Sequence, residues 1–135
     1  MNDEDGNRSK IITAVLSRLA GEDYCYLTTT GRVSGRPHEI EIWFGIQNST
    51  LYLLSGGGNN SDWVKNLRAH PPVTVRIAKH TFTGMARIVN DEKEDTAARY
   101  MLAEKYQEWN EGQSLSDWAR TALPVAIDLK SSANK

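Results

Sequence analysis

A regular alternation of apolar and polar residues constrains the fold of this chain more than any other feature. Between His38 and Gln47, apolar side chains stand at every second position: Ile40, Ile42, Phe44 and Ile46. A period of two is typical of a strand with one buried face and one solvated face. We therefore predict a strand over residues 39–46, with its apolar face toward a core.

Other segments predict further strands. Runs rich in β-branched, aromatic and aliphatic residues, separated by turn residues, occur at 24–30, 51–55, 73–77, 82–89 and 124–129. These strands follow one another in hairpins and do not alternate regularly with helices, as a parallel βαβ fold would require. We predict a mainly β protein with helices (α+β), in which about six antiparallel strands form a small barrel with helices packed outside.

Helical spacing of apolar residues predicts helices at 9–20, 61–70, 91–109 and 114–122. Ser9 is placed to cap the first of them, and Gly21 to end it. A chain of 135 residues has the length of one domain. We assign that domain to residues 9–130, with a disordered N-terminus at 1–8 and a frayed tail at 131–135.

Charge and composition exclude several classes of function. The net charge is −1, which gives no global positive field for nucleic acid. No apolar run approaches the length of a membrane span, about 20 residues, and the polar start of the chain is no signal peptide. We therefore expect a cytoplasmic protein with no integral membrane span. Cys25 is the only cysteine and the three histidines lie in separate elements, so no metal site is predicted, and His38 is expected to be a surface or satisfied histidine.

Two loops carry an unusual number of anion donors. In TTTGRVSGRP, residues 28–37, Gly31 and Gly35 can adopt positive φ and turn successive backbone N–H groups to one side, forming an anion-binding nest. Arg32 and Arg36 add charge. The second loop, SGGGNN at 55–60, leads into a helix N-terminus, where anions are favoured. Together the loops favour a phosphorylated ligand, although ordinary turns with solvated arginines explain the composition equally well.

Both loops also carry a resemblance to a known family. LTTTGRVSGRP and SGGGNNSDWVKNLRAHPPVTVRI, in this order and spacing, resemble the deazaflavin-dependent nitroreductases of the flavin-binding split-barrel (pyridoxamine 5'-phosphate oxidase-like) superfamily. The resemblance covers residues 24–89 and extends more weakly to 129. It implies a six-stranded antiparallel split β-barrel and the cofactor F420. Related split barrels bind FMN, which is the alternative cofactor.

The resemblance also implies a cofactor site. Its residues come from both loops and from the helix after the second: Thr30, Arg32, Ser34, Gly35, Arg36, Ser55, Gly57, Gly58, Trp63 and Asn66. Many family members have a basic residue in place of Val33 and a lysine in place of Gly56, so this chain offers fewer cations. Tyr100 and Tyr106 are candidates for the substrate side, but their helical spacing suits the core equally well. No other catalytic residue is identified.

The function implied by the resemblance is hydride transfer from reduced F420 to a small electron-poor acceptor such as a quinone, a nitroaromatic or an enone. In such enzymes the cofactor supplies the chemistry and the protein supplies binding and orientation. Two alternatives stay open: an FMN-dependent oxidoreductase, and a non-enzymatic flavin- or deazaflavin-binding protein. Trp43, a large apolar group on an otherwise polar strand face, makes a homodimer possible. We expect the loop arginines to contribute to cofactor affinity and to contribute little to fold stability.

Overall fold

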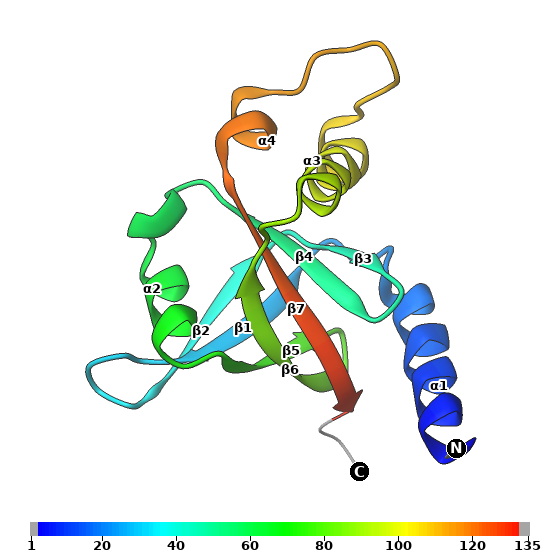
Figure 1. Cartoon of the computed structure of the whole chain (residues 1–135), viewed down its shortest axis with the longest axis vertical. Coiled ribbons are helices and arrows are strands. Elements are labelled where there is room, and N and C mark those ends of the chain that lie inside the picture. Colours follow the sequence, from blue (N-terminus) through cyan, green and yellow to red (C-terminus); the bar gives the residue numbers. More distant parts are fainter. Residues whose placement is uncertain (1–2, 133–135) are drawn as a thin grey trace.

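The computed structural model describes residues 3–132, which form one curled antiparallel sheet surrounded by helices (Figure 1). The sheet has seven strands in the order β2-β1-β5-β6-β7-β4-β3. The strands are β1 (Cys25–Thr30), β2 (Pro37–Ile42), β3 (Gly45–Gln47), β4 (Thr50–Ser55), β5 (Pro72–Ile77), β6 (His80–Ile88) and β7 (Leu123–Ser132). The helices are α1 (Asp3–Leu19), the 3₁₀ turn η1 (Gly58–Asn60), α2 (Asp62–Ala69), α3 (Glu92–Gln107) and α4 (Asp117–Thr121).

The sheet confirms the predicted antiparallel split-barrel class, with seven strands in place of six. The additional strand arises because the predicted strand at 39–46 is interrupted: β2 pairs with β1, whereas β3 pairs with β4. At the interruption, the Tyr106 hydroxyl accepts the backbone N–H of Phe44 at 3.0 Å and lies 3.0 Å from the Phe44 carbonyl. The backbone of Phe44 therefore bonds to a side chain of α3.

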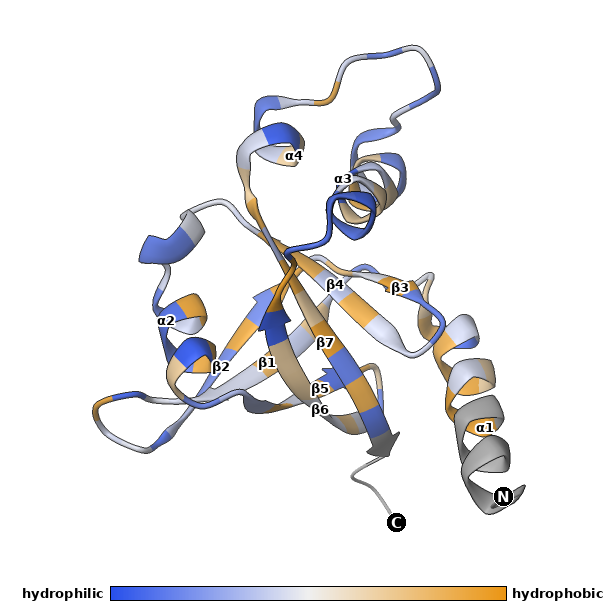
Figure 2. Ribbon diagram, in the orientation of Figure 1, coloured by the Kyte–Doolittle hydropathy of each residue, from blue (hydrophilic) through white to orange (hydrophobic). Residues whose placement is uncertain are grey.

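The core lies inside the curl of the sheet. Alternate residues of the strands point into it, including Leu27, Leu53, Val75 and Ile127, each with no exposed surface. Helices α1 and α2 lie on either side of the strands, and α3 and α4 lie beyond one end of the sheet (Figure 1). The strands show the expected alternation of apolar and polar residues, while the helices and loops are more polar on their outer surfaces (Figure 2).

A second apolar cluster lies where α3 and α4 meet the sheet. It contains Tyr52, Leu54, Val89, Ala98, Leu102, Ala122 and Ala126. Helix α3 is capped as its sequence suggests, because the Asp91 side chain accepts the N–H of Glu94 at 2.8 Å. This cluster fixes the long connection between β6 and β7 against the sheet.

The chain ends differ from the predicted boundaries. Helix α1 begins at Asp3, so residues 3–8 form its first part and Ser9 is not its N-cap. Strand β7 extends to Ser132. Residues 1–2 of the predicted disordered start and 133–135 of the predicted frayed tail lie outside the described residues. Within residues 3–132, no helix is long and apolar enough to cross a membrane.

Candidate functional site

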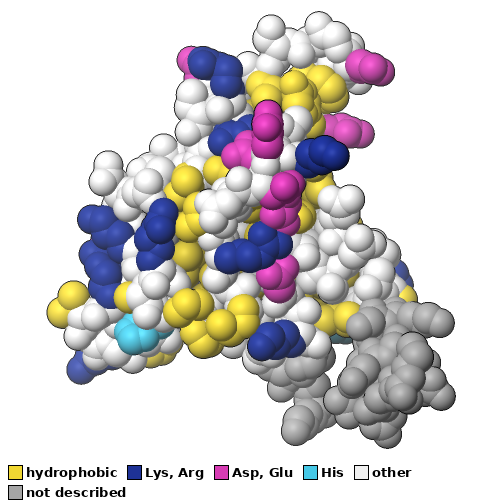
Figure 3. All heavy atoms as spheres, viewed as in Figure 1, with side chains coloured by type: hydrophobic (Ala, Val, Ile, Leu, Met, Phe, Trp, Pro, Cys, Tyr) yellow, Lys and Arg dark blue, Asp and Glu magenta, His cyan; other side chains and the backbone are white. Residues whose placement is uncertain are grey.

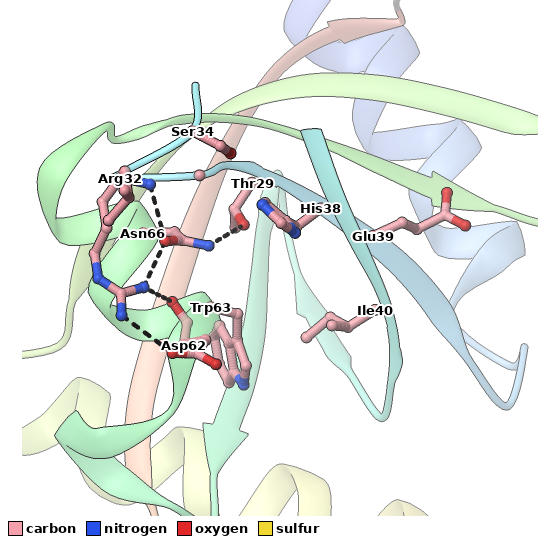
Figure 4. A pocket seen from close by; sticks show the side chains of 11 residues that line it. Thr29, Arg32, Ser34, His38, Glu39, Ile40, Asp62, Trp63 and Asn66 are labelled. Carbon is pink, nitrogen blue, oxygen red and sulfur yellow. Dashed lines mark hydrogen bonds and ion pairs between the residues drawn. The ribbon is translucent and has the colours of Figure 1, made fainter. Parts of the chain in front are cut away.

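A pocket of about 540 Å³ opens between the β1–β2 loop, strand β2 and helix α2. Its lining residues are Thr29, Gly31, Arg32, Val33, Ser34, His38, Glu39, Ile40, Asp62, Trp63 and Asn66. Figure 4 shows that the loop and α2 form one wall and that β2 forms the facing wall. The pocket thus joins the two sequence motifs that carry the family resemblance.

Arg32 ties the loop to α2. Its Nη1 donates to Asn66 Oδ1 at 2.8 Å, and its Nη2 lies 3.1 Å from Asp62 Oδ1 (Figure 4). The backbone N–H of Arg32 also donates to Asn66 Oδ1, at 3.1 Å. Because a guanidinium carries five N–H donors, these bonds do not exhaust it. Arg32 is 33% exposed at its side chain, so it remains accessible to an anion in the pocket.

The predicted backbone nest is wrong for most of the loop. The N–H of Gly31 donates to Arg36 O, the N–H of Gly35 donates to Gly31 O, and the N–H of Arg36 donates to Ser34 Oγ. With the N–H of Arg32 bonded to Asn66, these donors satisfy acceptors of the protein itself. Gly35 has the expected positive φ of 72°, but Gly31 does not belong to the positive-φ glycines. Anion donors in this loop are therefore side chains more than backbone.

The N-terminus of α2 supplies a second group of donors beside Arg32. Ser61 holds the N-cap position, but its side chain makes no capping bond; its Oγ lies 2.8 Å from Ser55 Oγ instead. The first N–H groups of α2 therefore have no side-chain cap, and the helix dipole favours negative charge at this end. Asp62, in the first turn, supplies some of that charge, and its side chain is 85% exposed.

The pocket has a polar floor and an apolar residue on each of its two facing walls. Asn66 is buried and donates from Nδ2 to Thr29 Oγ1 at 3.3 Å, which connects α2 to β1 beneath the pocket. Trp63 of α2 and Ile40 of β2 face the same space from opposite walls (Figure 4). Apolar walls, one of them carrying a tryptophan ring, suit an aromatic ligand.

Basic side chains are exposed on the two elements that form the loop-and-helix wall of the pocket, whose lining also contains Glu39 and Asp62. Lys and Arg side chains gather over the part of the molecule where α2 lies (Figure 3). On α2, Lys65 and Arg68 are exposed, and Arg36 is exposed in the adjoining loop. A local positive region in a chain of net charge −1 favours an anionic ligand at this place.

The structure brings some of the predicted site residues together and leaves others apart. Arg32, Ser34, Trp63 and Asn66 line the pocket. The predicted residues that do not line it are Thr30, Gly35, Arg36, Ser55, Gly57 and Gly58. Thr30 instead lines a groove of about 380 Å³ with residues of β5 and β6.

The glycine loop shapes the approach to α2. Ser55 is buried and donates to Gly58 O at 3.0 Å. A Cβ at Gly57 would lie 2.5 Å from Ser61 Oγ, and Gly58 has a φ of 59°. These glycines therefore allow a tight turn that holds Ser61 at the start of α2.

Tyr100 and Tyr106 lie on α3 and do not line the pocket. Tyr106 stacks on Trp43 with ring centroids 4.4 Å apart, and its hydroxyl lies 2.9 Å from Asp23 O. Burial raises the pKa of Tyr106 to about 12. Tyr100 packs against Trp109, with ring centroids 4.7 Å apart. These contacts favour the interpretation of both tyrosines as packing residues.

Two ionisable groups, the half-buried Lys105 and the buried Cys25, lie near the interruption between β2 and β3. Lys105 donates to Phe44 O at 3.0 Å, and burial lowers its pKa to about 8. Cys25 has no exposed surface, and burial raises the pKa of its thiol to about 12. A thiol with a raised pKa is a poor nucleophile at neutral pH, which agrees with its interpretation as a small apolar core residue.

Sequence reasoning missed several pocket residues. Asp62 and Thr29 bond to predicted site residues that are distant along the chain, and no local pattern marks them. His38 was predicted to be a surface or satisfied histidine, and it is exposed, but its place in the pocket lining was not predicted. The available signal was its position within TTTGRVSGRPH, directly after the first motif.

Comparison with solved structures identifies the class of fold. The chain is similar to a candidate 5-nitroimidazole antibiotic resistance protein from Bacteroides thetaiotaomicron, with a TM-score of 0.71 and 20% identity over 88% of this chain and 80% of the other. A candidate pyridoxamine 5'-phosphate oxidase from Listeria innocua gives a TM-score of 0.68 and 19% identity, over 93% and 99% of the two chains. An F420-H2 dependent reductase gives a TM-score of 0.61 and 21% identity, over 78% of this chain and 93% of the other. At these identities the likeness shows the fold, a flavin-binding-type split barrel.

The family follows from the sequence match. Residues 5–130 match the family described as F420H(2)-dependent quinone reductase, so the chain belongs to that family. This confirms the predicted class, an oxidoreductase that uses coenzyme F420. The acceptor and the residues that hold the cofactor stay predictions.

Proposed function

We propose that this protein transfers a hydride from reduced F420 to a small electron-poor acceptor, and that both bind at the pocket between the β1–β2 loop and α2. The observation that carries the proposal is the convergence of the two motifs on this pocket, with Arg32 of the first motif bonded to Asn66 of the second. Membership of the F420H(2)-dependent quinone reductase family supports the reaction class.

The donor set suits F420, which combines a flat ring with a phosphate and an anionic tail. Arg32 and the uncapped start of α2 would hold negatively charged groups, and Trp63 would contact the ring. The exposed cations Lys65 and Arg68 of α2 and Arg36 of the β1–β2 loop belong to the same two elements as the pocket lining and would attract the tail. The bound cofactor supplies the hydride chemistry, while these residues bind it and orient it.

A quinone is the acceptor that the family description favours, and nitroaromatics and enones are the other candidates. All of them accept a hydride at an electron-poor carbon or at a conjugated oxygen. The pocket walls formed by Trp63 and Ile40 are apolar and would accept a second flat ring beside the first. Holding two rings in contact lowers the barrier by orientation, which is worth up to about 7–11 kcal/mol in the best cases.

The test is oxidation of chemically reduced F420 by purified protein, followed at the absorbance of the oxidised deazaflavin. Menadione, a nitroaromatic and an activated enone are supplied as separate acceptors, and reduced FMN replaces reduced F420 in a parallel series. We expect turnover with F420 and menadione. Turnover with FMN alone would support the alternative cofactor, and tight F420 binding without turnover of any acceptor would support a carrier protein.

A homodimer remains a prediction. Its original motivation weakens, because Trp43 packs against Tyr106 and Trp118 of the same chain. Edge strand β2 still offers exposed backbone along one side of the sheet. Sedimentation at tens of micromolar protein separates a species near 15.1 kDa from one of twice that mass.

A further inference from the structure

His38 enters the pocket from the wall that faces Arg32. It lies on β2 opposite Thr29 of β1. It shares its strand face with Ile40, two residues further along, because side chains alternate along a strand. The hydrogen bonds between the loop and α2 are made by Arg32, Asp62 and Asn66. His38 takes no part in them and lies on β2 (Figure 4).

The glycine at position 31 makes room for His38. A Cβ at Gly31 would lie 2.7 Å from His38 Nε2 and 2.7 Å from Ser34 Oγ, closer than real Cβ atoms approach. Gly31 does not have a positive φ, so its backbone conformation does not itself require glycine. The close approach of two polar side chains therefore explains why glycine suits this position.

This arrangement brings two hydrogen-bond donors to one end of the pocket. An imidazole N–H and a hydroxyl can both donate to carbonyl oxygens. The neighbouring wall residues Ile40 and Trp63 are apolar, and the Trp63 side chain is planar. A planar ring that carries carbonyl oxygens on one edge matches this layout, with one face against Trp63, its other face open toward Ile40 for the acceptor, and its oxygens toward His38 and Ser34. The deazaflavin ring of F420 has such an edge in its pyrimidinedione.

We propose that His38, which the absence of a side chain at Gly31 accommodates, binds the carbonyl edge of the deazaflavin ring with the assistance of Ser34 and sets the orientation of that ring. This inference rests on the proposed function, since it assigns the ring its place within the same pocket. Arg32 and the start of α2 bind the anionic part of the cofactor, and His38 determines specificity for the ring.

Equilibrium binding distinguishes these roles without measuring turnover. Two probes are titrated into the full chain and followed by fluorescence: oxidised F420, and its ring-and-ribityl fragment, which lacks the phosphate and the glutamate tail. The variants are His38→Leu, His38→Gln and Gly31→Ala, with His80→Leu as a matched control because His80 is an exposed histidine on β6 that does not line the pocket. Side-chain nitrogen NMR of the wild type reports whether the His38 signal shifts when the fragment is added.

We expect His38→Leu to weaken binding of both probes by the same factor, about threefold to tenfold, the effect of losing one hydrogen bond. His38→Gln, which keeps a donor, should recover part of that loss. Gly31→Ala should resemble His38→Leu, and the double variant should lose little more, because both changes act on one contact. The His38 signal should shift with the fragment, and the control should bind like the wild type.

Other outcomes overturn the inference in distinguishable ways. If His38→Leu weakens F420 but not the fragment, then His38 contacts the phosphate or the tail and not the ring. If neither probe is affected, His38 is only a wall residue and the proposed function still stands. If wild-type protein binds neither probe, the proposed function fails together with the inference. Melting temperatures of all variants show whether a loss of binding follows from a loss of folding.

Discussion

Arg87 and Arg32 both pair with carboxylates, and their side chains are 41% and 33% exposed, yet the partners that surround them differ. Arg87 on β6 bonds both carboxylate oxygens of Glu94 at 2.7 Å, and it also bonds Asp128 of β7 at 2.7 Å. Glu94 accepts a further hydrogen bond from Tyr52 Oη, at 2.5 Å. This network, which we call the Arg87 network, joins the start of α3 to the sheet, and its donors and acceptors bond mainly to one another.

Arg32 is bound more loosely. Its carboxylate partner, Asp62, is 85% exposed, whereas Glu94 in the Arg87 network is 20% exposed. An exposed ion pair contributes about 0–1 kcal/mol to stability, so a ligand anion can replace Asp62 at little cost. The comparison indicates what separates a structural arginine from one that can bind a ligand. The structural arginine has its N–H groups bonded to shielded carboxylates of the protein, whereas the other pairs with an exposed carboxylate.

The largest expected effect is on cofactor affinity in Arg32→Ala. Charge-assisted hydrogen bonds contribute about 1.5–3 kcal/mol each, so we expect F420 affinity to fall by about tenfold to a hundredfold. The free energy of unfolding should fall by up to about 1 kcal/mol. This loss is larger than the sequence suggested, because Arg32 also bonds Asn66 and Asp62. Fluorescence titration and urea unfolding measure the two quantities.

Arg36→Ala is the matched comparison, since Arg36 is exposed in the same loop but does not line the pocket. We expect a smaller loss of affinity from this variant than from Arg32→Ala. An affinity change of less than twofold in both variants would mean that the loop is an ordinary turn.

Arg87→Met should show the opposite pattern. Glu94 and Asp128 would lose their partner, and we expect the free energy of unfolding to fall by about 2 kcal/mol, with part of the loss offset by solvent. F420 affinity, corrected for the folded fraction, should be unchanged. Urea unfolding and cofactor titration on the same preparations check this. A tenfold loss of affinity with an intact fold would remove the distinction between the two arginines.

The stability contributed by the Arg87 network should depend on pH. Hydrogen bonding by Arg87 lowers the pKa of Glu94 from 4.5 to about 2. A carboxyl whose pKa is lower in the folded state stabilises the fold above the unfolded pKa, and this contribution disappears as the pH falls through the folded pKa. The difference in unfolding free energy between wild type and Arg87→Met should therefore shrink from pH 4.5 toward pH 2. A constant difference over this window would contradict the assignment.

Tyr106→Phe tests whether this tyrosine serves packing or substrate. The variant keeps the stacked ring but leaves the Phe44 N–H without its acceptor, so we expect a loss of stability of about 1 kcal/mol. The F420 affinity and the KM for menadione should not change. A raised KM with unchanged stability would restore Tyr106 as a substrate-side residue.

The smallest expected effect is a gain. Asp62→Asn removes the charge that competes for Arg32, so F420 affinity should rise by about twofold to fivefold, a change of well under 1.4 kcal/mol. Asp117→Asn is the control, since Asp117 occupies the first turn of α4 and pairs with Arg120, away from the pocket. A loss of affinity in Asp62→Asn would show that Asp62 positions Arg32 and does not compete with the ligand.

The sequence predicted the strands and helices well because both depend on local periodicity. It did not predict the interruption at Phe44, because Phe44 keeps the alternation: its side chain is fully buried, and the apolar neighbours in the pattern, Ile42 and Ile46, also pack against the core. The cause is Tyr106, which lies far along the chain and bonds the Phe44 backbone. A hydrogen bond to a residue far along the chain does not change the alternation of apolar and polar residues, so that alternation cannot reveal it.

The candidate site was predictable to a similar extent. The two motifs correctly indicated four pocket residues: Arg32 and Ser34 from the first, and Trp63 and Asn66 from the second. Residues that are close in sequence within one loop or one helical turn stay close in the fold. The backbone nest failed because the N–H of Arg32 bonds Asn66, and those of Gly31 and Gly35 bond acceptors within the loop. Whether an N–H group is free depends on the whole fold, so glycine content alone overestimates the number of available donors.

The central claim is that F420 binds between the β1–β2 loop and α2, and amide NMR tests it most directly. Oxidised F420 is titrated into isotopically labelled protein, and the change in each amide signal is mapped on the fold. We predict that the largest changes fall in residues 29–40 and 61–66, and that the amides of Arg87, Glu94 and Asp128 hardly move. The account would be contradicted if the largest changes in amide signals fell along α3 or in the groove lined by Thr74 and Met85, while the signals of the pocket residues did not change.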